Sequence, residues 1–136
     1  MAHRAAQVGE VPVGAVVVKN GIAAARAYNT RQQSKEPTAH AEILAIRQAS
    51  VVTGDWRLTN TTLYVTLEPC PMCAGAILAS RIPRVVYGAA DPKAGAVDSL
   101  FGLLSDHRLN HQVEVRSGVL AEESRRLLRL FFGKRR

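Results

Sequence analysis

Three short apolar runs, rich in valine and other β-branched residues, constrain the fold most, because such runs are typical of buried strands. They occupy residues 11–18 (VPVGAVVV), 61–67 (TTLYVTL) and 84–88 (RVVYG). The Asn20-Gly21 pair after the first run is a strong hairpin signal, so residues 22–28 are expected to return as a second strand. Residues 112–118 predict a weaker fifth strand.

Segments of helical composition separate these strands. They cover residues 38–52, a stretch that starts at Pro69 or Pro71, and residues 120–132. Thr38 is a plausible N-cap of the first, and the polar residues 29–37 are expected to form a loop. Strands that alternate with helices predict an α/β fold of three layers (α/β/α), in which a mixed five-stranded central sheet has helices on both faces. The length of 136 residues predicts a single domain, residues 1–136.

The charge balance favours a polyanionic partner. The chain has 18 basic and 11 acidic residues, a net charge of +7, which indicates nucleic acid first and an ordinary solvated surface as the alternative. No uninterrupted apolar run reaches the roughly 18 residues of a membrane span, and the N-terminus lacks the apolar core of a signal peptide. We therefore expect no membrane contact and a cytoplasmic location, where a structural disulfide is disfavoured.

The only two cysteines, Cys70 and Cys73, lie in the segment EPCPMCAGA at a predicted helix start. Residues three positions apart share one face of a helix, and the helix N-terminus lowers the cost of holding thiolates. Zinc prefers such ligands. The pair by itself is also compatible with a redox couple or with two buried small residues.

His40 is the best candidate for a third ligand. It lies in PTAHAEI, also at a predicted helix start, and Glu42 follows two positions later. Because residues i and i+2 point about 200° apart around a helix, both side chains can approach one metal only from beyond the helix end. A catalytic zinc site needs three protein ligands, whereas a structural site needs four. A closed site with His107 or His111 as fourth ligand would indicate a nucleic-acid-binding module without catalysis.

Glu42 is not needed as a ligand, so it can act as a base beside the metal. It can take a proton from a zinc-activated water and pass it to a ring nitrogen and then to a departing amine. Addition of water to an amidine-like carbon with loss of ammonia is hydrolytic deamination. The residues are therefore compatible with a zinc-dependent deaminase, an activity that a resemblance to a known family implies.

Two motifs resemble the signature of the zinc-dependent nucleoside and nucleobase deaminases: His40-Ala-Glu42, and the later Pro69-Cys70-Pro-Met-Cys73. Longer runs, above all EVPVGA and TLYVTLEPC, resemble the bacterial tRNA-specific adenosine deaminase family. That family converts the wobble adenosine of a tRNA anticodon to inosine. The similarity extends over almost the whole chain.

The resemblance implies roles for individual residues. One zinc ion per chain would be bound by His40, Cys70 and Cys73, and Glu42 would shuttle protons. The flipped adenine would be held or walled by Asn29, Ala41, Val13 and Leu67. Contacts to nucleic acid would come from Asp91, Lys93, Phe131, Phe132, Lys134, Arg135 and Arg136. The implied partners are a tRNA anticodon stem-loop and a second copy of the chain in a homodimer.

Some features depart from the family pattern or stay open. The first helix is expected to be largely truncated, Ala90 stands where many relatives carry arginine, and Val97-Asp98 replaces a common pair of small residues. Phe131 and Phe132 either pin the last helix to the core or contact nucleic acid. The alternative functions are a small-molecule nucleobase or nucleoside deaminase and an enzyme acting on adenine in single-stranded DNA.

Overall fold

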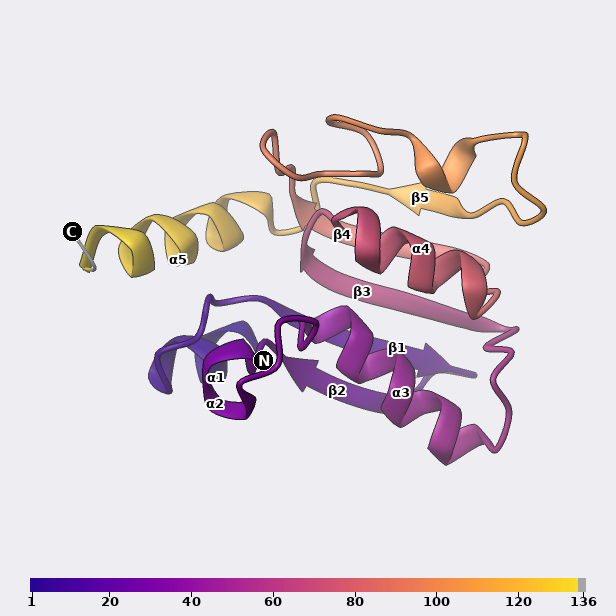
Figure 1. The fold of residues 1–136 in the computed structure, drawn as a ribbon, viewed down its shortest axis with the longest axis horizontal. Coiled ribbons are helices and arrows are strands. Elements are labelled where there is room, and N and C mark those ends of the chain that lie inside the picture. The colour runs from indigo at the N-terminus through magenta and orange to yellow at the C-terminus, as the bar shows by residue number, and fades with distance from the viewer. Residues whose placement is uncertain (135–136) are drawn as a thin grey trace.

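The computed structural model describes residues 1–134, which form one mixed five-stranded sheet with helices on both faces (Figure 1). The strand order is β2-β1-β3-β4-β5; β1 is antiparallel to β2 and β3, whereas β3, β4 and β5 are parallel. This architecture confirms the predicted fold class. The elements are α1 (Ala2–Gln7), β1 (Gly14–Lys19), β2 (Ile22–Tyr28), α2 (Arg31–Ser34), α3 (Ala41–Thr53), β3 (Thr61–Leu67), α4 (Pro71–Ala79), β4 (Arg84–Ala89), the 3-10 turn η1 (Leu103–Ser105), β5 (Glu114–Arg116) and α5 (Ala121–Lys134).

The first hairpin forms as predicted. Asn20 and Gly21 have φ angles of 53° and 76°, and two positive φ angles are what a two-residue hairpin turn with the twist of the strands requires. β1 begins at Gly14 rather than at residue 11. Pro12 has no N–H to donate to a neighbouring strand, and the N–H of Val13 donates to the Val11 carbonyl instead.

Helices α3 and α4 cover one face of the sheet. Alternate strand residues point to the same face, and those that enter the core beneath these helices include Ala15, Val17, Leu63, Val65 and Val85. The buried face of α3 carries Ala41, Ala45 and Ala49, spaced four residues apart. Their small side chains allow α3 to lie close to β1 and β2, which fixes the position of its N-terminus.

Helices α1 and α5 lie on the opposite face. A Cβ added at Gly14 would be 2.5 Å from the Met1 Cβ, so only glycine allows α1 to approach β1 this closely. The Ser124 hydroxyl of α5 donates to the Thr66 carbonyl of β3 at 2.6 Å. From this contact α5 runs outward beyond the sheet to the C-terminus (Figure 1). None of the helices in residues 1–134 is long and apolar enough to cross a membrane.

Two sequence predictions about local structure are wrong, and a third gives the right place for a strand but too great a length. Thr38 is not the N-cap: His40 is, with extended backbone, and α3 begins at Ala41. The predicted loop at residues 29–37 contains α2, because the Glu10 carboxylate accepts hydrogen bonds from the N–H groups at its start. The fifth strand is limited to Glu114–Arg116, since the chain turns at Gly118, where φ is +82°.

Candidate active site and metal centre

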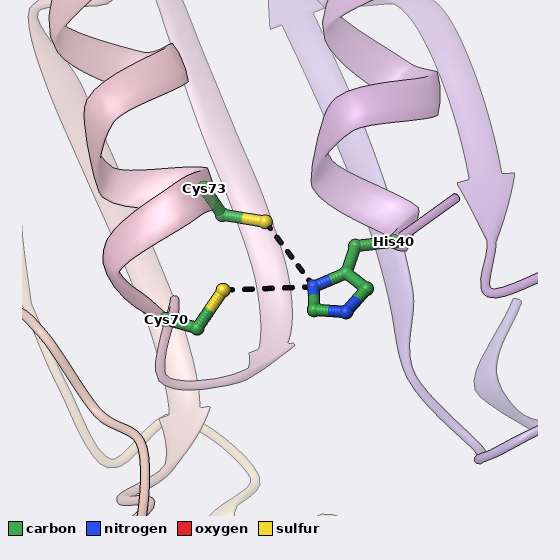
Figure 2. Close-up of side chains that lie close together, drawn as sticks. All are labelled: His40, Cys70 and Cys73. Atoms are coloured by element: carbon green, nitrogen blue, oxygen red, sulfur yellow. Dashed lines mark hydrogen bonds between the residues drawn. The ribbon is translucent and has the colours of Figure 1, made fainter. Parts of the chain in front are cut away.

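The N-termini of α3 and α4 bring His40, Cys70 and Cys73 together, as Figure 2 shows. His40 and Cys70 are the N-cap residues of the two helices, and Cys73 lies in the first turn of α4, where Pro71 occupies the first position. The His40 Nδ1 atom lies 3.6 Å from the Cys70 Sγ and 3.5 Å from the Cys73 Sγ. The two motifs, 30 positions apart in sequence, therefore meet at one point.

These distances fit a shared metal ion. The three ligand atoms lie within 4.8 Å of one another and form a group that could hold a metal. Metal–nitrogen and metal–sulfur bonds of about 2.0 and 2.3 Å at a tetrahedral angle place nitrogen and sulfur about 3.5 Å apart. The observed separations agree with this value, so the side chains need little rearrangement to bind an ion.

No fourth ligand completes the group within residues 1–134. His111, one of the two candidates from the sequence, directs its Nε2 atom to the Ile82 carbonyl at 2.8 Å. That bond holds the His111 ring beside Ile82, two residues before β4 begins. A three-ligand site with an open position is the arrangement of catalytic rather than structural zinc sites.

The pKa values of the two thiols move in opposite directions. A hydrogen bond from Cys73 lowers the pKa of Cys70 to about 4, and the same bond, together with burial, raises the pKa of Cys73. The hydrogen bond with Cys70 also raises the pKa of His40. A metal ion supplies positive charge of its own, which allows both sulfurs to bind as thiolates.

Glu42 lies beside this group in the first turn of α3. Its side chain is buried, and burial raises the pKa of its carboxyl, although a backbone hydrogen bond and the charge of His40 oppose the shift. The angular conflict between positions i and i+2 does not arise, because His40 stands outside the helix with ψ of 150°. A buried carboxyl with a raised pKa holds a proton more readily than a solvated one, which suits a group that accepts a proton and then returns it.

Asn29 joins β2 to the start of α3. Its side-chain oxygen accepts a hydrogen bond of 2.7 Å from the Ala41 N–H, and its own N–H donates to the Val13 carbonyl. The structure therefore brings Asn29 and Ala41 into contact one residue from His40. Val13 is almost wholly buried in the core, directly before β1.

A groove of about 790 Å³ runs between α5 and the connection that follows β4. We call it the basic groove after the charged side chains at its rim, Lys93, Arg125 and Arg129, which lie with Asp91 around a mainly apolar lining of Val11, Leu67, Ala89, Ala90, Pro92, Leu128 and Phe132. Leu67, Asp91, Lys93 and Phe132 were singled out from the sequence, whereas Arg125 and Arg129 were not. The Asp91 carboxylate is engaged locally, because it accepts from the N–H groups of Lys93 and Ala94.

A second, smaller groove of about 350 Å³ lies on the other side of Phe132. Its lining includes Asn29, the two phenylalanines, and side chains of both charges: Arg31, Lys35, Glu10 and Glu36. Phe131 and Phe132 contact each other edge to face at 5.3 Å, and Phe132 is 48 % exposed. Phe132 therefore does not pin α5 to the core. Lys134 is exposed at the end of α5, and Arg135 and Arg136 lie outside the described residues.

Comparison with known proteins identifies the family. A profile described as MafB19-like deaminase matches residues 1–136. A tRNA-specific adenosine deaminase from Bacillus subtilis is 54 % identical over 131 residues, which cover 96 % of this chain and 81 % of that protein. The chain belongs to the tRNA-specific adenosine deaminase family. The enzyme from Haemophilus influenzae is 52 % identical, with 100 % and 79 % of the two chains covered.

A solved structure from work on A-to-I editing by tRNA:A34 deaminases at the wobble position has the same fold. Its TM-score is 0.90 at 46 % identity, and the match covers 93 % of this chain and 92 % of that one. The fold of this family member is thus shared by a solved relative, with the match covering almost all of both chains.

Sequence reasoning missed one residue of this deaminase entirely. Glu68 directly follows β3 and is 2 % exposed. Burial by itself raises the pKa of its carboxyl, but hydrogen bonds from Ser99 and from backbone N–H groups outweigh burial and lower this pKa to about 2. A glutamate between a buried strand and a proline is unusual, because charged residues are rarely buried. The run TTLYVTLEP contains this arrangement, so the sequence offers one indication that Glu68 has a special role.

Proposed function

We propose that this chain catalyses the hydrolytic deamination of adenosine to inosine in RNA, at the wobble position of a tRNA anticodon. The observation that carries this proposal is the meeting of His40, Cys70 and Cys73 beside the buried Glu42. Membership of the family agrees with it. The whole described chain acts as one deaminase domain in this proposal.

We assign one zinc ion to the three ligands, because two thiolates and an imidazole suit zinc better than the harder divalent cations. When bound, zinc supplies a Lewis acid that lowers the pKa of a water molecule. Glu42 would take one proton from the attacking water and deliver it to N1 of adenine, where it stays in inosine. It would then carry the remaining proton of the new 6-hydroxyl group to the leaving amine. A C–O bond forms at C6, the C–N bond breaks, and ammonia leaves.

The remaining residues orient the base and the strand. Asn29, fixed by its bond to Ala41, is positioned to hold the adenine, while Val13 and Leu67 provide apolar walls. The basic groove, together with Phe131, Phe132 and the tail from Lys134 to Arg136, receives the phosphates and unstacked bases of the loop. We further propose that the enzyme works in the cytoplasm as a homodimer. Light scattering of the purified protein tests the oligomeric state, and a measured mass of one chain would refute the homodimer.

The decisive experiment supplies zinc-loaded protein with an anticodon stem-loop that contains a wobble adenosine. Parallel reactions contain the DNA version of the same loop and free adenosine. We expect inosine and ammonia from the RNA at a kcat/KM at least tenfold above both alternatives. Faster turnover of free adenosine would make the chain a small-molecule deaminase, and faster turnover of the DNA would make 2′-hydroxyl groups irrelevant to recognition.

Binding of the stem-loop should weaken steeply with salt, because it depends on phosphate contacts. Each phosphate contact contributes about −0.7 to the slope of log K against log salt concentration for a single strand. We expect Arg129→Ala to weaken binding and to reduce this slope by about that amount. Arg84→Ala is the matched control, since Arg84 begins β4 at the end of the sheet away from the groove. Equal slopes for both variants would remove Arg129 from the interface.

A further inference from the structure

The Glu68 carboxylate accepts hydrogen bonds from several residues of the connection between β4 and η1. It is buried two residues before the ligand Cys70, and every donor that reaches it comes from residues 91–99. Oε1 accepts from the N–H of Asp91 (3.0 Å) and from the Ser99 hydroxyl, and Oε2 accepts from the N–H groups of Val97 (3.1 Å), Asp98 (2.8 Å) and Ser99 (2.9 Å).

The connection is shaped to admit this carboxylate. A Cβ added at Gly95 would lie 2.3 Å from the Glu68 Cδ and 2.4 Å from each carboxylate oxygen, so no larger residue fits there. Two backbone bonds reinforce the approach: the Ala96 N–H donates to the Pro69 carbonyl at 2.9 Å, and the Glu68 N–H donates to the Ala89 carbonyl at 2.8 Å.

The two halves of the connection have different surroundings. Residues 90–93 form a wall of the basic groove, where Lys93 is exposed and Asp91 is half-buried. Residues 95–97 are buried and carry the bonds to Glu68 and Pro69. Asp91 belongs to both halves, because its N–H binds Glu68 while its carboxylate holds the turn that presents Lys93. A displacement of the buried half would therefore move the groove wall.

We propose that Glu68 is a positioning residue, which locks residues 90–99 onto the strand that leads to Cys70 and so holds the wall of the basic groove in register with the metal site. The inference rests on the proposed function for its substrate, RNA, and extends it to a residue that touches neither metal nor substrate. Recognition of the strand and placement of the reacting base then depend on one buried carboxylate.

Replacement of Glu68 by glutamine tests the lock. A glutamine side chain has one acceptor oxygen, and its NH₂ group would face backbone N–H groups that need an acceptor. We expect amide hydrogen exchange at residues 97–99 to accelerate at least tenfold, and KM for the RNA stem-loop to rise about tenfold with a much smaller change in kcat. Zinc content should stay at one ion per chain.

Gly95→Ala tests the same contact from the other side, with no substitution in the segment that carries the metal ligands. Its methyl group would displace the carboxylate, so we expect the same acceleration of exchange and the same rise in KM. Gly102→Ala is the matched control, because a Cβ at Gly102 would be 3.4 Å from the nearest atom, an ordinary contact. We expect this variant to behave as the parent chain does.

The proposal is overturned if either Glu68→Gln or Gly95→Ala, folded and fully loaded with zinc, leaves both the exchange rates and KM within twofold of the parent. It is also overturned if the variants lose zinc and kcat while KM is unchanged, since Glu68 would then support the metal rather than the groove. Failure of the parent chain to deaminate the RNA would refute the proposed function separately, because the exchange measurement needs no substrate.

Discussion

Replacement of Glu42 by glutamine is expected to reduce the rate of adenosine deamination by about 10³- to 10⁴-fold, the upper range for loss of a general acid–base group. Glutamine has nearly the shape of glutamate and fits the same buried position, but it cannot take a proton from water. Because the ligands His40, Cys70 and Cys73 are unchanged, zinc content and thermal stability should remain those of the parent chain.

The measurement is single-turnover inosine formation with saturating enzyme, accompanied by zinc analysis of the same samples. Glu114→Gln is a suitable control, because Glu114 is an exposed glutamate at the far edge of the sheet, on β5. We expect that control to retain full activity. Near-normal turnover by the Glu42 variant would exclude this carboxylate as the proton shuttle.

Replacement of Cys70 by alanine is expected to abolish both metal binding and activity. The remaining His40 and Cys73 offer two ligands, too few for a stable zinc site. A ligand present at about a thousandfold above its Kd stabilises the folded state by about 4 kcal/mol. Loss of that term should lower the Tm of a chain of this size by about 10 °C.

The test compares zinc content and melting curves with and without a chelator. The parent chain should lose stability when the chelator is added, whereas the Cys70→Ala variant should not respond. His111→Gln is the control, because His111 binds the Ile82 carbonyl rather than the metal site. Full zinc loading of Cys70→Ala, or loss of zinc from His111→Gln, would contradict the three-ligand assignment.

The sequence was informative where a property depends on neighbouring residues. Alternating apolar runs and the Asn20-Gly21 turn predict the first four strands, and the two motifs predict that His40 and Cys70 mark helix starts. The prediction for Thr38 failed, because its hydroxyl bonds to Glu36 rather than capping a helix. The capping of α2 could not be predicted, since Glu10 is more than twenty residues away from it.

The groove residues illustrate the same limit. Arg125 and Arg129 lie on α5, and their place in the same groove as Lys93 depends on where α5 meets the sheet. Glu68 stands beside a recognised motif, yet its partners are 23 to 31 positions further along the chain. Sequence patterns are recognised over short windows of residues. A contact between residues this far apart in the chain therefore leaves no recognisable pattern.

The sequence by itself determined the chemistry of this protein: the ligand types, the neighbouring carboxylate and the alternation of strands and helices all lie within short windows. Only the tertiary structure decided that the imidazole and the two sulfurs lie 3.5 to 3.6 Å apart, and that residues 90–99 close around Glu68. The physical reason is that side-chain chemistry is local, whereas the meeting of two helix ends depends on packing across the whole sheet. Small alanines in α3 and the parallel pairing of β3 with β4 set that packing.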